Sequence, residues 1–139
     1  MRALLDVNVL IALLDADHAS HDSAISWFAK HAREGWASCP ITQNGCIRIM
    51  SNPGYPNPLP VQAVIEHLAE ACHQDIHEFW PDEVSLLDSD VVDSTRIHGP
   101  RQLTDIYLLL SRFNIKDGSL LLIRAFRSPR SGKLQRRNC

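Results

Sequence analysis

The chain has 139 residues, a formal net charge of −2 and 45% hydrophobic residues, which suits one domain with an ordinary buried core. Its four cysteines (Cys39, Cys46, Cys72, Cys139) have neither C-x-x-C spacing nor the density of a secreted scaffold, so we expect reduced thiols in a cytoplasmic protein. The sequence shows no signal peptide and no membrane-spanning apolar run, and its charge balance excludes a global basic field for nucleic acid.

The first elements of the chain are an apolar strand and a helix, with Asp6 between them. Residues 3–5 are apolar, and from Asn8 the apolar spacing becomes helical through residue 14. Asp6 therefore stands at the carboxyl end of a strand, where open α/β sheets build their sites. Asn8 is expected to cap the helix, although Asp6 taken alone is equally well explained as a cap or turn former.

Extended and helical segments alternate along the rest of the chain. Short extended runs occupy residues 36–39 and 77–80, and helical spacing occupies residues 21–33, 41–50, 61–72 and 101–113. The proline-rich residues 52–60 indicate an irregular loop, and the acidic residues 85–96 a solvated turn with a short helix. This alternation predicts parallel β-α units and a helix-covered sheet, an α/β fold.

Large aromatic side chains are expected to carry much of the core. A second interpretation applies to Trp80, which precedes no helix and lies next to Pro81: it could stack a nucleic-acid base. The aromatic residues expected in the core are Trp27, Phe28, Trp36, Phe79 and Trp80.

Three ordered blocks carry a family resemblance. They read Asp-Val-Asn-Val-Leu-Ile-Ala-Leu-Leu at 6–14, Cys-Pro-Ile-Thr-Gln-Asn-Gly-Cys-Ile-Arg at 39–48, and Arg-Gln-Leu-Thr-Asp-Ile-Tyr-Leu-Leu at 101–109. Together they resemble the PIN-domain family, and more narrowly the VapC-type toxins of bacterial toxin–antitoxin pairs. The resemblance covers residues 1–109 and implies one PIN-like domain over 1–139, a three-layer α/β/α sandwich with a central parallel sheet, and an atypical tail at 110–139.

The resemblance also implies a metal-dependent endoribonuclease, the toxin of a type II toxin–antitoxin system. Asp6 and Asp105 would bind Mg²⁺ or Mn²⁺, Asn8 and Thr104 would orient them, and Gln43 would stand near the place where many relatives have a glutamate. Converging carboxylates need such a hard cation, and a metal-activated water can attack the RNA phosphate. The implied partners are an RNA substrate, a VapB-like antitoxin and a second copy in a homodimer.

The carboxyl-terminal part departs from the family. Relatives usually end in a strand reading Thr-Phe-Asp that supplies the last acidic ligand, whereas no acid follows Asp117 here. Synonymous codons for residues 116–123 exist that read Gly-Arg-Leu-Val-Thr-Phe-Asp when shifted by one base, so we hypothesise a frameshift near Leu110. A gene without TTTGAT across codons 121–123 would reject it. Residues 118–123 are apolar enough to substitute as a strand, and Asp93 or Asp117 could replace the acid.

Three other functions stay open. A PIN scaffold could bind antitoxin or RNA without cleaving it. A haloacid-dehalogenase-like phosphatase would use Asp6 as its nucleophile but needs an acid where Asn8 stands. A receiver domain would need an acidic pair that the sequence lacks.

Two polar groups are better explained without a site. A turn between helices accounts for the acids and histidines of residues 15–22, and the histidines at 67, 73 and 77 lack zinc-finger spacing.

Overall fold

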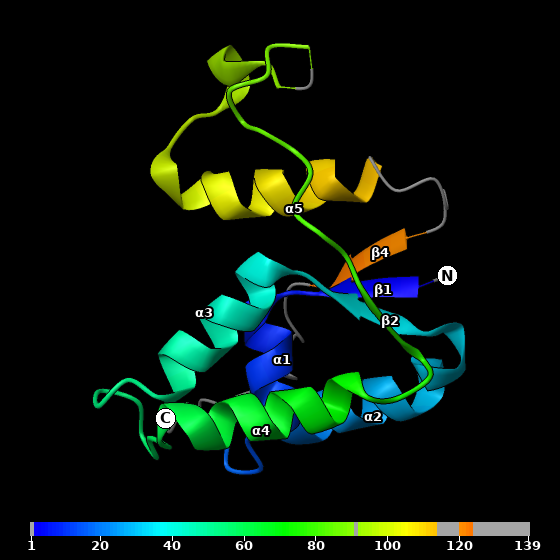
Figure 1. Ribbon diagram of the computed structural model, residues 1–139, viewed down its shortest axis with the longest axis vertical. Coiled ribbons are helices and arrows are strands. Elements are labelled where there is room, and N and C mark those ends of the chain that lie inside the picture. The colour runs from blue at the N-terminus through cyan, green and yellow to red at the C-terminus, as the bar shows by residue number, and fades with distance from the viewer. Residues whose placement is uncertain (1, 91, 114–119, 124–139) are drawn as a thin grey trace, which may run out of the picture.

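The computed structural model describes residues 2–90, 92–113 and 120–123, and within them a single parallel sheet forms the centre of the molecule (Figure 1). The strands lie in the order β3-β2-β1-β4. Each neighbouring pair is parallel. Their bounds are β1 (Arg2–Leu5), β2 (Trp36–Ser38), β3 (His77–Phe79) and β4 (Leu120–Ile123).

Five helices connect these strands. They are α1 (Val7–Leu14), α2 (His21–His31), α3 (Pro40–Met50), α4 (Val61–Cys72) and α5 (Leu103–Phe113), with single 3₁₀ turns at Ala32–Glu34, Ser94–Arg96 and Pro100–Gln102. Figure 1 shows α5 on one side of the strands and α1, α2 and α4 on the other. The predicted α/β/α sandwich with a central parallel sheet is confirmed.

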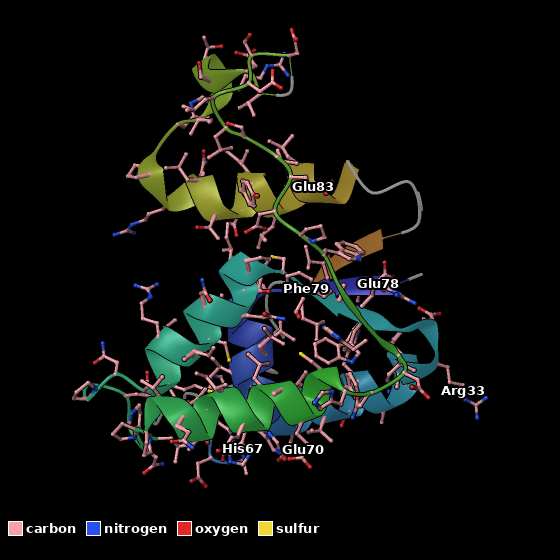
Figure 2. All side chains as sticks on the ribbon, viewed as in Figure 1. Arg33, His67, Glu70, Glu78, Phe79 and Glu83 are labelled. Carbon is pink, nitrogen blue, oxygen red and sulfur yellow. The ribbon has the colours of Figure 1, made fainter. Side chains whose placement is uncertain are left out.

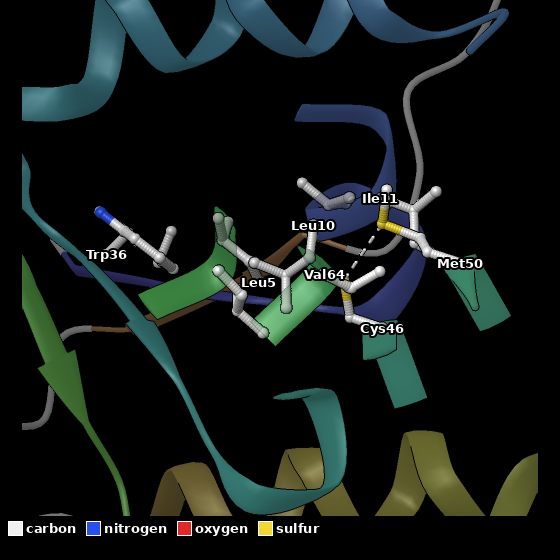
Figure 3. Packing of buried hydrophobic residues seen from close by; sticks show 10 residues of the cluster. Leu5, Leu10, Ile11, Trp36, Cys46, Met50 and Val64 are labelled. Carbon is white, nitrogen blue, oxygen red and sulfur yellow. Dashed lines mark hydrogen bonds between the residues drawn. The ribbon is translucent and has the colours of Figure 1, made fainter. Parts of the chain in front are cut away.

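Alternation along β1 divides the core between the two faces of the sheet. Leu5 packs with residues of α1, α3 and α4, including Leu10, Cys46 and Val64 (Figure 3). Leu4 packs on the opposite face with Tyr107 and Leu108 of α5 and with Trp80. Neighbouring residues of a strand point to opposite faces, which explains why a continuous apolar run serves both layers.

The start of the first helix differs from the prediction. The N-cap is Asp6, whose backbone is extended (φ −69°, ψ 162°) and whose carboxylate accepts a hydrogen bond from the Val7 N–H. Asn8 is already inside α1, so the expectation that Asn8 caps the helix was wrong. Asp6 caps the helix because its side chain lies at the strand end, where it accepts a hydrogen bond from one of the unpaired N–H groups of the first turn, that of Val7.

The aromatic residues follow the prediction with one exception. Trp36 and Trp80 are 4% and 3% exposed, and Trp27 and Phe28 pack partly buried against the core. The burial of Trp80 leaves no face for a base. Phe79 is 51% exposed, so its expected place in the core was wrong. Phe79 is the last residue of the three-residue strand β3, and its side chain lines an open pocket beside α3 and α4.

The tail supplies one strand of the sheet. β4 pairs with β1 along its whole length, with Arg2 opposite Leu120 and Leu5 opposite Ile123. The idea that the apolar run substitutes as a strand is confirmed for Leu120–Ile123. Asp117, the remainder of residues 114–119 and residues 124–139 lie outside the described part of the chain.

Candidate functional site

The carboxyl edge of the sheet, where Leu5, Ser38, Phe79 and Ile123 end their strands, begins with Asp6. Asp6 is 9% exposed. Its Oδ1 lies 2.7 Å from the Val7 nitrogen. Its backbone carbonyl accepts hydrogen bonds from the Val9 and Leu10 N–H groups. The helix start thus holds this carboxylate next to the positive end of the α1 dipole.

Asp105 reaches the same edge from α5. Only residues 114–119 separate α5 from β4, so the end of α5 lies near the start of β4 and its first turn lies at the carboxyl edge. Asp105 is one turn before Leu108, and residues at this spacing share a helix face. Leu108 is fully buried against Leu4.

The same strand alternation places Asp6 on the α5 side of the sheet. Leu4 faces α5, and Asp6 follows it by two residues in extended backbone. Asp6 is therefore on the face of the sheet that α5 covers, and Asp105 is in the first turn of α5. Asn8 and Thr104, their neighbours in the first turns of α1 and α5, are both exposed.

Gln43 lies at the same edge but turns toward the other face. Its Nε2 donates a hydrogen bond to Ser38 Oγ, at 2.9 Å. Ser38 Oγ lies 2.8 Å from Nε2 of His77 and 3.9 Å from the sulfur of Cys72. Gln43 is thus part of a polar network beneath α4, whereas Asp6 and Asp105 lie on the α5 side.

Two further acids serve local structure: Asp93, which the sequence suggested as a substitute ligand, and Asp82, which it did not. Asp93 caps the turn Ser94–Arg96, accepting from the Thr95 N–H and pairing with Arg96. Asp82 is bonded to Tyr107 of α5, and burial raises the pKa of its carboxyl group although that hydrogen bond lowers it. β4 reads Leu-Leu-Leu-Ile and adds no carboxylate beside Asp6.

The donor set fits a weakly held Mg²⁺. Among the described residues, no three His, Cys, Asp or Glu side chains gather as a metal cluster. Mg²⁺ commonly uses only one or two protein carboxylates, keeps several waters and takes further oxygens from substrate phosphates. Asp6 and Asp105 match that pattern. Mg²⁺ takes oxygen ligands, so the cysteine sulfurs and histidine nitrogens are not required as ligands.

Several polar contacts have no motif in the sequence. The Ser38–His77 hydrogen bond joins residues on neighbouring strands, which only the β2–β3 register brings together. The Tyr55 hydroxyl donates to Asp15 across the proline-rich loop. The sequence offered one signal for Phe79, its place at the end of an extended run with Trp80. That signal predicted a core residue and not a residue that lines a pocket.

The remaining cysteine and turn predictions agree with the structure. Cys39, Cys46 and Cys72 are free thiols. Burial raises the pKa of Cys46 to about 12, so this thiol stays protonated. Asp15 and its neighbours form the turn between α1 and α2. In the described part of the chain, no helix has the length and apolar character needed to cross a bilayer.

Comparison with known proteins places the chain in a family. Ribonuclease VapC44 of Mycobacterium tuberculosis is 56% identical over 109 residues, which are 78% of this chain and 77% of that protein. Ribonuclease VapC39 of the same organism is 40% identical over 110 residues, 78% of this chain and 79% of that protein. Ribonuclease VapC38 is 40% identical over 108 residues, 77% and 74% of the two chains.

No protein-family model matches the chain. Identity of this level over three quarters of both chains, together with the parallel α/β fold, is nevertheless sufficient for assignment. The chain belongs to the VapC-type toxins, the PIN-domain ribonucleases of toxin–antitoxin systems.

Proposed function

We propose that this chain cleaves RNA phosphodiesters as a Mg²⁺- or Mn²⁺-dependent endoribonuclease, with Asp6 and Asp105 as the metal ligands. The observation that supports this most is Asp6 itself, a 9% exposed carboxylate at the carboxyl end of β1, on the face of the sheet that α5 covers. Parallel α/β proteins bind ligands beyond this edge. The VapC relatives are named ribonucleases.

The roles of the chain's own residues follow from their surroundings. A bound divalent cation would supply an acidified water and positive charge at the leaving oxygen. Asp6 is held in place because the Val7 N–H donates a hydrogen bond to its Oδ1. Asp105 is fixed by the turn of α5 that ends in buried Leu108. Asn8 and Thr104 are positioning residues in this proposal.

Gln43 is assigned a supporting role at the same edge. One N–H of its amide is donated to Ser38, which leaves the second N–H and the carbonyl oxygen to contact RNA. It contributes no charge, which leaves two carboxylates to balance a divalent cation.

The proposed biological role is that of the toxin in a cytoplasmic toxin–antitoxin pair. Its partners are RNA as substrate, a VapB-like antitoxin that covers the acidic edge, and a second copy in a homodimer. VapC relatives at 56% and 40% identity support this role.

Cleavage of a labelled total-RNA or tRNA pool tests the proposal. We expect cleavage with Mg²⁺ or Mn²⁺, none with EDTA, and a loss of roughly 100-fold or more in Asp6→Asn and Asp105→Asn. Asn is as good an N-cap as Asp, so Asp6→Asn should keep the start of α1. Asp93→Asn, which removes an acid that caps an exposed turn, is the matched control. Equal cleavage by all four proteins would reject the assignment.

A second function is favoured by β4. This strand lies directly beside β1 and carries no acid, so the edge holds one family carboxylate fewer. A PIN scaffold that binds antitoxin or RNA without cutting is therefore the alternative. It predicts no cleavage by the wild-type chain but a stable complex with its antitoxin, which size-exclusion chromatography of the coexpressed pair would detect.

A further inference from the structure

A pocket of about 420 Å³ opens between α3, α4 and the end of β3. Its aliphatic walls are Ile47, Ile65 and Leu68, and Phe79, Gln43 and His77 contribute the aromatic and polar groups. The volume lies in the range of small-molecule sites. Its lining is mostly apolar with a few polar groups that converge, which is the usual composition of such a site.

Phe79 is the exposed member of this pocket. His77 and Phe79 are two residues apart on β3 and so share a face, the one covered by α4. Half of the Phe79 surface remains in solvent, and Figure 2 labels it where the chain leaves β3. A half-exposed ring beside an apolar wall leaves one aromatic face for a ligand ring to stack on.

The polar end of the pocket is held by a buried serine. Ser38 has no exposed surface; it accepts from Gln43 Nε2 and lies 2.8 Å from His77 Nε2. Burial lowers the pKa of His77, which favours the neutral ring, and a 2.8 Å hydrogen bond joins its Nε2 to Ser38 Oγ. This network fixes the Gln43 amide, whose second N–H and carbonyl oxygen form a donor and acceptor pair.

The charge of the side chains that line the pocket indicates which class of ligand it can bind. None of the described residues lining the pocket is Lys, Arg, Asp or Glu, and its ionisable groups are the imidazoles of His73 and His77 and the thiol of Cys72. The lining therefore carries no permanent charge to pair with a phosphate, a carboxylate or an ammonium group. A neutral planar ring with hydrogen-bonding groups at its edge fits both the Phe79 face and the Gln43 amide. Proteins bind unstacked RNA bases in this way, by stacking and by amide hydrogen bonds to base edges.

We propose that this pocket binds one unstacked base of single-stranded RNA, with Phe79 as the stacking residue and Gln43 contacting the edge of the base. The inference rests on the proposed ribonuclease function. β3 is two strands from β1, about 10 Å at normal strand spacing. Phe79 lies on the α4 side of the sheet and Asp6 on the α5 side, so an RNA strand that contacts both would pass over the carboxyl edge, where both strands end. The pocket would thus select the base near the cleaved phosphate.

RNA binding is measured in EDTA, which removes divalent metal and so separates base binding from metal-dependent cleavage. Fluorescence anisotropy is recorded for the full chain with a short single-stranded RNA and with an abasic oligomer that has the same phosphates. We expect the wild type to prefer the RNA. Phe79→Ala should weaken RNA binding roughly 5- to 100-fold, the loss of one base–aromatic stack, and leave binding of the abasic oligomer unchanged.

Two further variants make the test specific. Phe79→Trp keeps a stacking face and should retain the preference for RNA. Ile25→Ala removes an apolar side chain with similar exposure, 44%, on α2, and should bind as the wild type does. Equal loss of affinity for RNA and abasic oligomer in Phe79→Ala, or no loss for either, would overturn the proposal.

The same experiment separates this inference from the proposed catalysis. A Phe79-dependent preference for bases in a chain that cleaves nothing supports the pocket and rejects the catalytic assignment. Cleavage that needs Asp6, with RNA binding indifferent to Phe79, rejects the pocket alone. If Phe79→Ala changes the oligomeric state in analytical ultracentrifugation but not RNA affinity, the pocket binds a second copy of the chain instead, and the base proposal fails.

Discussion

Gly45 of α3 lies directly against Val7 of α1: a Cβ placed on Gly45 would be 2.7 Å from Cγ2 of Val7. Val7 follows Asp6 and donates its N–H to the Asp6 carboxylate. The missing side chain of Gly45 therefore lets the two helices meet where the candidate metal ligand is held. Glycine is required here for close approach rather than for an unusual backbone angle, since Gly35 is the described residue with positive φ.

Gly45→Ala is expected to destabilise the protein. Alanine in a helix interior is normally favoured by about 0.5–1 kcal/mol. A contact of 2.7 Å with a β-branched side chain that has little rotamer freedom should cost about 1–3 kcal/mol and outweigh that gain. Urea denaturation should show a lower midpoint. Gly99→Ala, where no atom lies within 4 Å of the added methyl group, is the control and should be neutral or slightly stabilising.

The Tyr55 hydroxyl ties the proline-rich loop to the end of α1 by donating to Asp15. This hydrogen bond holds the pKa of the Asp15 carboxyl below its usual 3.8. A depressed carboxyl pKa stabilises the fold above the unfolded value and loses that effect as pH falls through the folded value. Tyr55→Phe should cost about 1 kcal/mol at pH 7, and the cost should shrink below about pH 4. A constant cost from pH 7 to pH 3 would contradict this contact.

The sequence predicted the order of elements because apolar periodicity reports directly which face of each segment is buried. α4 and α5 carry the clearest apolar faces, and the structure forms helices there at Val61–Cys72 and Leu103–Phe113. The side-chain partners of Asp6 and Gln43 could not be predicted in the same way. They depend on φ and ψ at one strand end and on the register of β2 with β3, which are properties of the assembled sheet.

His77 should make stability depend on pH in the acid range. Burial lowers the pKa of its ring from 6.5, so the unfolded chain binds more protons than the native one as pH falls. Stability is then complete above about pH 6.5 and declines as pH drops toward the folded value. Urea midpoints from pH 7.5 to 5 should fall more steeply in the wild type than in His77→Gln, and parallel curves would argue against a buried neutral ring.

The carboxyl end of β4 offers a direct test of what the altered tail has done to the site. Ile123 is opposite Leu5 in the β1–β4 register, so a residue at the end of β4 lies beside the strand that ends in Asp6. Replacing Leu120–Ile123 with Val-Thr-Phe-Asp restores the family ending and adds a third carboxylate at this edge. More negative charge should bind a divalent cation more tightly and raise Mg²⁺-dependent RNA cleavage by roughly tenfold or more.

The matched control for this replacement is Val-Thr-Phe-Asn, which keeps the shape of the new strand and omits the charge. Position 123 is one residue short of the position opposite Asp6. Without metal, a carboxylate added there should still destabilise the fold by like-charge repulsion across the carboxyl edge, and Mg²⁺ should reverse that loss. Melting temperatures of both variants with EDTA and with Mg²⁺ measure this difference. If the Asp and Asn variants melt alike in both buffers and cleave alike, the end of β4 does not contribute to the metal site, and Asp6 and Asp105 must act without a partner from this strand.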